Sequence, residues 1–344
     1  MERATQVVGQ SGPFLDALER ASRAAQLDRP VLVIGERGTG KELVAERLHR
    51  LSSRWEEPLV VMNCAALPET LIEAELFGHE AGAFTGATKA RVGRFEEADG
   101  GTLFLDELGT LSMGAQERLL RAVEYGEVTR IGSSRPIRVD VRIVAATNEH
   151  LPDQVDCGTF RADLLDRLSF EVVTLPPLRA RTGDIMVLAD FFGRRMAAEI
   201  GRDEWPGFGP NAVDQLMEHR WPGNVRELRN AVERSVYRWE RPGPIDLIEV
   251  DPFASPFRPR GSGGASTPVA SIAPAGAPVS GEAGAPDDPC DDFKTRVNRF
   301  ERQLLTRAMA EARYNQRTCA DALGLTYDQL RHALKRHGLL GQGG

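Results

Sequence analysis

Short apolar runs recur along the first half of the chain, and amphipathic stretches separate them. The runs lie at 31–35, 59–63, 102–107, 141–147 and 170–175. They are almost continuously apolar, as central strands covered on both faces are. Because helical patterns lie between successive runs, the sequence predicts the α/β fold class, with a parallel central sheet flanked by helices.

The pattern changes after "LPPLR" at 175–179, where strand-like runs stop. Helical patterns follow at 184–200, 210–219 and 223–238, and they predict a smaller helical subdomain.

A stretch dominated by Pro, Gly, Ala and Ser comes next. Such a segment cannot bury enough apolar surface to offset its ordering entropy, so we expect a flexible linker. The expected boundaries are 1–177 for the α/β subdomain, 178–250 for the helical subdomain, 251–290 for the linker and 291–344 for a C-terminal domain.

Charge is distributed unevenly along the chain. The 344 residues carry a net charge of −7, whereas residues 291–344 hold ten Lys and Arg against six Asp and Glu, a balance of +4. An acidic body with a basic tail predicts that only the tail approaches nucleic acid. The sequence has neither a bilayer-spanning apolar stretch nor an N-terminal signal-peptide core, so we expect a cytoplasmic protein without membrane insertion.

A glycine-rich loop, "GERGTGKE", joins the first apolar run to a helical pattern. Its spacing matches the phosphate-binding loop G-x-x-x-x-G-K, although Glu42 takes the place of the Ser or Thr that contacts magnesium. Backbone N–H groups of such a loop converge on phosphate oxygens, and Lys41 adds a positive charge. The expected nucleotide-binding residues here are Gly35, Glu36, Arg37, Gly38, Thr39, Gly40, Lys41 and Glu42.

Polar residues close three of the other apolar runs. Asp106 and Glu107 end "TLFLDE", where an Asp holds the magnesium shell and a Glu activates water. A solvated acidic turn is the alternative, but the phosphate loop about 65 residues earlier favours a nucleotide hydrolase. Asn63 and the pair Thr147–Asn148 close neighbouring runs, at the sheet edge where ligands bind.

Two arginines lie six residues apart in "FRADLLDRLSF", on a predicted helix. Arginine suits a transferring phosphoryl group, but the spacing of Arg161 and Arg167 alone favours surface salt bridges.

The basic tail contains two helical patterns within 313–339, joined by Gly324 and Leu325. The pattern is typical of a helix-turn-helix whose second helix enters the major groove, with a helical docking hairpin as the alternative. A longer helical pattern at 293–312 is suited to dimer pairing. The expected DNA-contacting residues are Thr326, Tyr327, Gln329, Arg331, His332, Lys335 and Arg336.

The stretch "HEAGAFTGATKA" at 79–90 places one aromatic residue among Gly and Ala. Glycine and threonine disfavour a helix, and an exposed phenylalanine signals contact with another molecule. From composition alone, this is a flexible loop with Phe84–Thr85 at its centre.

Five motifs together resemble those of the bacterial enhancer-binding proteins. They are "GERGTGKE", "ELFGHEAGAFTGA", "GGTLFLDE", "FRADLLDRL" and "WPGNVRELRN". These are AAA+ ATPases that activate transcription by RNA polymerase carrying sigma-54. The resemblance covers about residues 7–240, and the tail resembles the Fis-type helix-turn-helix of that family. The start at the ATPase, with "SSRW" and "RADLLDRL", is similar to activators of phage-shock (envelope stress) operons.

This resemblance implies ATP and Mg²⁺ as cofactors and assigns roles to individual residues. Asp106 positions the magnesium-bound nucleotide, Glu107 activates water, and Asn63 restrains that glutamate until a signal arrives. The remaining implied roles are sensor I for Thr147 and Asn148, arginine fingers for Arg161 and Arg167, sensor II for Arg226, and sigma-54 contact for Gly82, Ala83, Phe84, Thr85, Gly86 and Ala87.

An arginine that acts in a neighbouring subunit's site requires a ring, and the family's ring is a hexamer. The expected function is remodelling of the closed promoter complex from upstream enhancer DNA. Without a sensory domain in the chain, regulation is expected from a trans-acting inhibitory protein. Trp55, in the charged stretch "SSRWEEP", is its hypothetical docking point; simple packing against the preceding helix is the alternative.

Two other functions stay open. One is a different AAA+ remodeller, such as a helicase loader, with a DNA-binding tail used for recruitment. The other is a DNA-binding repressor that uses nucleotide only as a ligand.

Overall fold

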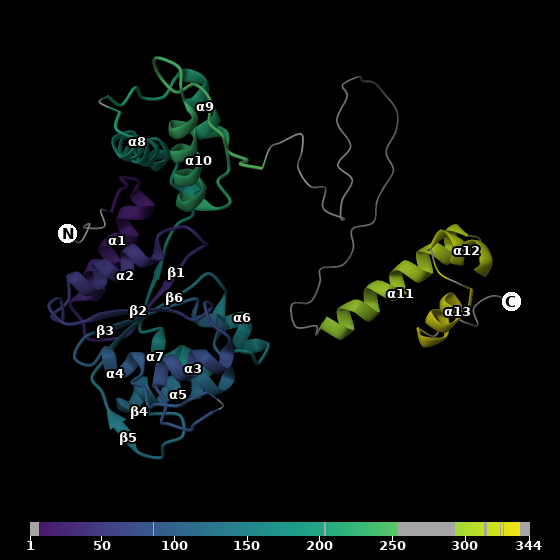
Figure 1. Cartoon of the computed structure of the whole chain (residues 1–344), viewed down its shortest axis with the longest axis horizontal. Coiled ribbons are helices and arrows are strands. Elements are labelled where there is room, and N and C mark those ends of the chain that lie inside the picture. The colour runs from purple at the N-terminus through teal and green to yellow at the C-terminus, as the bar shows by residue number, and fades with distance from the viewer. Residues whose placement is uncertain are drawn as a thin grey trace. The chain divides into compact units, whose positions relative to one another are not determined.

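The computed structural model describes residues 7–84, 86–202, 204–253, 293–312, 315–323, 325 and 327–337. The chain divides into two compact units, one within 1–266 and the other within 267–344 (Figure 1). Each unit has its own buried core.

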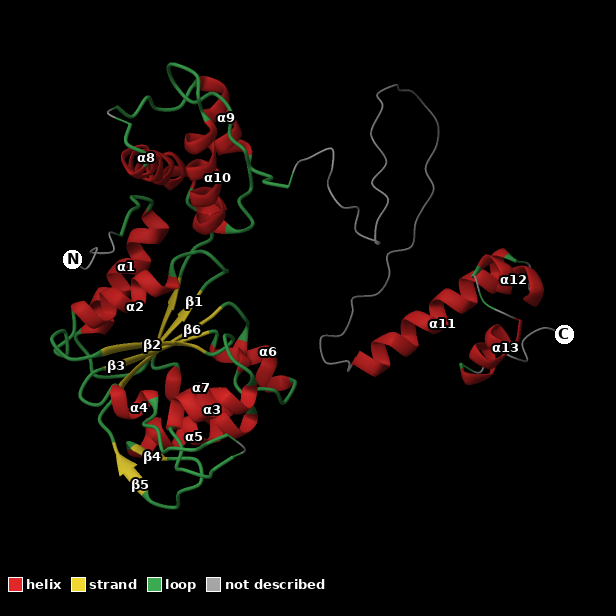
Figure 2. Cartoon of the chain, in the orientation of Figure 1, coloured by secondary structure: helices red, strands yellow, loops and turns green. Residues whose placement is uncertain are grey.

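A five-stranded sheet forms the centre of the first unit (Figure 2). Its strand order is β2-β3-β6-β1-β7. Every neighbouring pair is parallel, which confirms the predicted sheet. The strands are β1 (Val31–Ile34), β2 (Leu59–Asn63), β3 (Thr102–Asp106), β6 (Arg142–Thr147) and β7 (Glu171–Thr174).

Helices cover both faces of this sheet (Figure 2). In β1, Val31 and Val33 join a core with α1 and α2, whereas Leu32 joins a core with α3, α5 and α7. Successive side chains of a strand point to opposite faces, so two covered faces require a continuous apolar run. The helices are α1 (Gly12–Ala25), α2 (Lys41–Arg50), α3 (Glu69–Phe77), α4 (Arg94–Glu97), α5 (Met113–Tyr125), α6 (Leu151–Asp156) and α7 (Ala162–Leu168).

A two-stranded antiparallel hairpin, which the sequence pattern did not predict, follows α5. It pairs β4 (Glu127–Thr129) with β5 (Pro136–Arg138). Strands of three residues are too short to show a period-two pattern in the sequence.

Residues 178–250, which we call the lid, form the predicted helical subdomain. Its helices are α8 (Thr182–Glu199), α9 (Pro210–Glu218) and α10 (Asn224–Arg238). They enclose Trp221, which is fully buried and donates from Nε1 to the Leu216 carbonyl at 2.9 Å. This aromatic side chain anchors the lid core.

The second unit contains α11 (Phe293–Glu311), α12 (Gln316–Ala322) and α13 (Tyr327–Arg336). Leu305 and Met309 of α11 share a core with Cys319, Leu330 and Leu334. The predicted long helix followed by two short ones is therefore confirmed. Among the described residues, no helix has the length and apolar character needed to cross a membrane.

Candidate nucleotide-binding and hydrolysis site

The phosphate loop lies between β1 and α2. Gly38 and Gly40 have positive φ values of 78° and 98°, which glycine adopts without strain. A Cβ atom at Gly38 would lie 2.3 Å from the carbonyl oxygen of Gly223 in the lid, so this position also requires a residue without a side chain. Lys41 begins α2, and its buried ammonium donates to the Gly35 carbonyl at 2.9 Å.

The ends of β2 and β3 bring two predicted residues together. Asn63 lies opposite Asp106 in the strand register, and its Nδ2 donates to Asp106 Oδ2 at 3.4 Å. The other carboxylate oxygen, Oδ1, is buried and has no hydrogen-bond partner in the described part of the chain. Burial lowers the pKa of Lys41 nearby, although the negative charges of Asp106 and Glu107 oppose that shift.

Glu107 follows β3 in a left-handed backbone conformation (φ 56°), which is uncommon for a side-chain-bearing residue. Arg37 Nε lies 3.6 Å from its Oε1. With its amide turned to satisfy both neighbours, Asn148 donates to Glu107 Oε2 at 2.5 Å and accepts from Arg37 Nε at 3.3 Å. The amide that holds Glu107 is thus that of Asn148, whereas Asn63, expected to restrain this glutamate, contacts Asp106.

Thr147, the other predicted sensor residue, is fully buried at the end of β6. Its Oγ1 accepts from the Glu149 backbone N–H at 3.0 Å. This hydrogen bond supports the turn that carries Asn148 beside Glu107.

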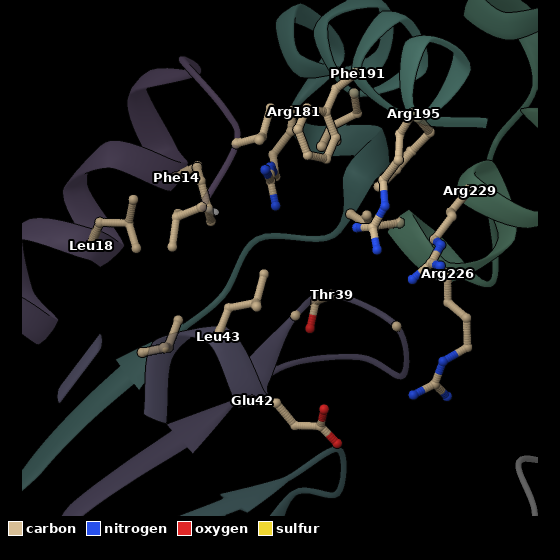
Figure 3. A pocket seen from close by; sticks show the side chains of 18 residues that line it. Phe14, Leu18, Thr39, Glu42, Leu43, Arg181, Phe191, Arg195, Arg226 and Arg229 are labelled. Carbon is tan, nitrogen blue, oxygen red and sulfur yellow. The ribbon is translucent and has the colours of Figure 1, made fainter. Parts of the chain in front are cut away.

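A cavity of about 500 Å³ opens beside the phosphate loop (Figure 3). Phe14 and Leu18 of α1 form one wall, Thr39 and Leu43 come from the phosphate loop and α2, and lid residues form the roof. An apolar cavity adjoining phosphate-binding amides is suited to a nucleotide base. Sequence analysis missed the cavity residues Val7, Val8, Phe14, Leu18, Leu43, Val44, Arg181, Leu188, Phe191, Phe192, Arg195, Val225 and Arg229. The apolar pair Val7–Val8 was the signal in the sequence that could have indicated a buried segment before α1.

The lid contacts the phosphate loop through the start of α10. The predicted sensor Arg226 lines the cavity, and its backbone N–H donates to the Gly38 carbonyl at 3.3 Å. Asn224, which sequence analysis missed, is fully buried and donates to the Arg37 carbonyl at 3.0 Å and to Glu36 Oε2 at 3.1 Å.

Glu36 also accepts from Arg179, at the start of the lid. Hydrogen bonds from Arg179 and then Asn224 hold the pKa of Glu36 at about 2. Both side chains are substantially exposed, so solvent screens this ion pair.

Arg161 and Arg167 do not line the cavity of their own chain. Arg161 is the residue before α7 rather than part of that helix, and its guanidinium donates to Asp163 at 2.7 Å. Arg167 donates to Glu124 at 2.7 Å. Within one chain both arginines therefore form salt bridges, the arrangement that their spacing indicated.

The GAFTGA stretch forms a loop closed at its base by a bridge between His79 and Arg91. Gly82 and Gly86 have φ values of 81° and 101°, a conformation that requires glycine. Phe84 is 37% exposed, and its ring centroid lies 5.0 Å from that of His79. Thr85 lies outside the described residues, and Ala83 and Ala87 complete the predicted contact segment.

In the second unit, the predicted DNA-contacting residues lie on α13 and at its start. Tyr327, Gln329, Arg331, His332 and Lys335 are exposed, opposite the buried Leu330 and Leu334. Arg336 forms an ion pair with Glu301 of α11. Thr326 lies outside the described residues.

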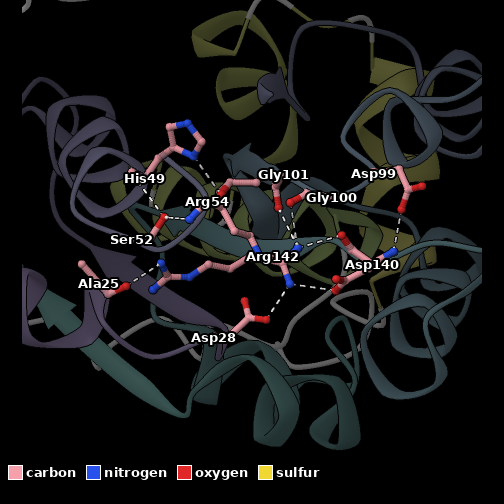
Figure 4. A network of polar contacts seen from close by, with 11 residues as sticks. Ala25, Asp28, His49, Ser52, Arg54, Asp99, Gly100, Gly101, Asp140 and Arg142 are labelled. Carbon is pink, nitrogen blue, oxygen red and sulfur yellow. Dashed lines mark hydrogen bonds and ion pairs between the residues drawn. The ribbon is translucent and has the colours of Figure 1, made fainter. Parts of the chain in front are cut away.

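A polar network supports the loop that carries Trp55 (Figure 4). Arg54 donates to the Asp140 carbonyl at 2.8 Å and to the carbonyls of Gly100 and Gly101 at 3.2 and 3.3 Å. Trp55 itself is 61% exposed. Simple packing against the preceding helix does not describe a side chain with this exposure.

A phosphate loop on a parallel sheet, roofed by a helical lid that contacts the same loop, defines an AAA+ ATPase. Family models match nearly the whole chain: "Sigma-54 interaction domain" at 7–174, "AAA+ ATPase lid domain" at 179–260 and "Bacterial regulatory protein, Fis family" at 296–337. The chain belongs to the sigma-54-dependent transcriptional activators, with a Fis-type DNA-binding domain.

Two curated relatives and one solved structure illustrate the similarity. The Psp operon transcriptional activator of Escherichia coli (strain K12) is 53% identical over 332 residues, which cover 96% of this chain and 97% of that protein. The transcriptional regulatory protein ZraR of Salmonella typhimurium is 53% identical over 230 residues, 67% of this chain and 52% of that protein. The crystal structure of NtrX from Brucella abortus in complex with ATP is 30% identical, with a TM-score of 0.65 over 97% of this chain and 70% of that one.

Proposed function

We propose that the chain hydrolyses ATP in order to remodel the closed complex of sigma-54 RNA polymerase. The observation that carries this proposal is the convergence of Lys41, Asp106 and Glu107 beside an apolar cavity roofed by the lid. The phosphates would bind the backbone N–H groups of the phosphate loop, with the base in the cavity. The ammonium of Lys41 would exchange its contact with the Gly35 carbonyl for one with phosphate oxygen.

The carboxylate of Asp106 fits a magnesium site, because its Oδ1 is buried without a hydrogen-bond partner among the described residues. Magnesium would neutralise developing charge on the phosphates. Glu107 would accept a proton from the attacking water. Asn148 and Arg37 hold the Glu107 carboxylate in place, which supports a role for them in orienting this glutamate toward the attacking water.

Arg161 and Arg167 would act in the site of a neighbouring subunit, in a hexameric ring. Each is partly exposed and paired with a carboxylate that a phosphate group can replace, Asp163 for one and Glu124 for the other. Asn63 would restrain Glu107 until a signal arrives, from its place beside Asp106, the residue that precedes this glutamate.

The GAFTGA loop would contact sigma-54 through Phe84 and Thr85. A partly exposed aromatic side chain between two glycines that adopt positive φ supports this role. Nucleotide hydrolysis would then change the position of the loop relative to its base.

The second unit would bind enhancer DNA through the exposed face of α13, and α11 would pair two tails as a dimer. Arg331 and Lys335 are exposed on α13 and are suited to base and phosphate contacts. The ion pair with Glu301 favours a structural role for Arg336.

The relative of similar length controls a Psp operon, which supports a phage-shock operon as the target here. Trp55, exposed on a loop that Arg54 anchors, would dock a trans-acting inhibitory protein. Trp55→Ala would leave ATP hydrolysis intact and abolish inhibition in a reconstituted assay; intact inhibition would refute the docking role.

Open-complex formation on a sigma-54 promoter tests the main function. Wild-type protein with ATP is expected to activate sigma-54 polymerase and no other holoenzyme. Glu107→Ala should bind ATP but hydrolyse it slowly, whereas Thr85→Ala should hydrolyse ATP without activating. An active Thr85→Ala variant would contradict the contact role of the loop, and undetectable hydrolysis by the wild type would favour a repressor.

A further inference from the structure

The segment before α1 contacts both the sheet side and the lid side of the nucleotide cavity. Val7 packs against the core shared by α1, α2 and the sheet, whereas the next residue, Val8, packs against the lid core. Both valines line the cavity. Residues 7–11, which we call the strap, therefore connect the sheet to the lid along one wall of the cavity.

A single lid carboxylate holds this strap. Asp184 Oδ1 accepts from the backbone N–H groups of Gln10 and Ser11 at 2.6 and 2.8 Å. Its Oδ2 accepts from Ser11 Oγ at 2.7 Å and from Arg181 Nε at 2.8 Å. Four donors therefore converge on a fully buried carboxylate. Burial acts to raise the pKa of Asp184, but these donors hold it below its ordinary value.

Arg181, which donates to Asp184, also lines the wall of the cavity (Figure 3). The guanidinium carbon lies 3.7 Å from the ring centroid of Phe14, and both side chains line the cavity. Gly9 permits this approach, because a Cβ atom there would lie 2.6 Å from the Phe14 ring and 2.9 Å from Arg181 Nη2. The pair lies on the side of the cavity formed by α1 and the strap, with the lid arginine Arg226 among the other lining residues.

We propose that Asp184 and Arg181 are positioning residues that assemble the base-binding wall of the cavity by joining the strap to the lid. This inference rests on the proposed binding of ATP in this cavity. A buried charged pair that loses one partner leaves the other uncompensated, so the wall depends on both residues. The pair sets the affinity for the base and ribose portion of the nucleotide, whereas the phosphate loop binds the phosphates without it.

Calorimetric titration of Asp184→Asn with ATP and with inorganic tripolyphosphate tests the proposal. Hydrogen bonds to a charged group contribute enough that we expect ATP affinity to fall by about tenfold or more. The Kd for tripolyphosphate is expected to stay unchanged. The KM for ATP should rise by the factor that the Kd does, and the backbone amides of Gln10 and Ser11 should exchange hydrogen faster.

Asp190→Asn provides the matched control on the same helix. Asp190 accepts from Arg194 and from Trp205 Nε1 at 2.6 and 2.7 Å, and none of these three residues lines the cavity. This variant should retain the wild-type affinities for both ligands. If Asp184→Asn fails to fold, Ser11→Ala removes one of the four hydrogen bonds and should give a smaller loss specific to ATP.

Equal losses for ATP and tripolyphosphate, an effect of the same size in Asp190→Asn, or unchanged ATP affinity in Asp184→Asn would overturn the proposal. The absence of ATP binding to the wild type would instead refute the proposed function. The two failures are therefore distinguishable in one set of titrations.

Discussion

The approach of the lid to Gly38 gives a sharp quantitative prediction. Gly38 has a φ of 78°, and an added Cβ would lie 2.3 Å from the Gly223 carbonyl and 3.0 Å from Arg226 Cβ. Gly38→Ala therefore adds left-handed strain and a steric clash. The clash can be relieved only by moving the lid, which would weaken the contact between the Arg226 N–H and the Gly38 carbonyl.

Gly158→Ala isolates the first of these effects. Gly158 has nearly the same φ, 73°, but an added Cβ meets nothing within 4 Å. Left-handed strain costs about 1–2 kcal/mol. Overpacking adds about 1–3 kcal/mol at Gly38 alone, so that variant should lose about 2–5 kcal/mol in all.

Thermal unfolding of the two variants measures this difference. A domain of this size loses about 2–4 °C in Tm for each kcal/mol. The expected decreases are about 2–8 °C for Gly158→Ala and about 4–20 °C for Gly38→Ala. Gly38→Ala should also lose ATP affinity, while Gly158→Ala keeps it. Equal Tm decreases for the two variants, with equal ATP affinities, would refute the inference that lid and phosphate loop are in close contact.

Three further predictions concern stability and reactivity. Because the pKa of Glu36 is lowered from 4.5 to about 2, its pairing with Arg179 stabilises the protein above pH 4.5 and is lost as the pH falls toward 2; the Tm difference between wild type and Arg179→Ala should shrink over that window. Burial, with the nearby negative charges of the site, raises the pKa of Cys64 to about 12. Alkylation of the Cys64 thiol at pH 8 should therefore follow unfolding, and rapid labelling of Cys64 in the folded protein would contradict the structure. Trp221→Ala should cost about 3–5 kcal/mol, and a denaturant titration showing a near-neutral effect would show that this side chain does not anchor the lid.

Local chemistry explains why much of the site was predictable. The phosphate loop, the pair Asp106–Glu107 and the polar ends of the other strands are short motifs on consecutive residues. Parallel strands bring their carboxyl ends to one edge, so the strand order placed Asn63 opposite Asp106 once the sheet had formed. The linker that composition predicts at 251–290 lies, from residue 254 onward, outside the described residues and stays a prediction.

Contacts between distant segments were not predictable in the same way. The structure assigns Asn148 rather than Asn63 to the Glu107 carboxylate, a choice that depends on side-chain direction and loop geometry. Arg161 lies one residue outside the helix expected to contain it, because that helix begins at Ala162. Asn224 belongs to the motif "WPGNVRELRN", but its role could not be read from that motif, since its partners are 187 and 188 residues away.

The sequence by itself determined the class of nucleotide site, the layered α/β body and the helical tail, because hydrophobic period and loop chemistry act over a few residues. Only the tertiary structure decided how the cavity is closed. Its walls combine the strap, α1, the phosphate loop and the lid, and Asp184 joins two of them across 173 residues of chain. A buried carboxylate selects its donors by geometry and desolvation, and neither property is visible until the chain has folded.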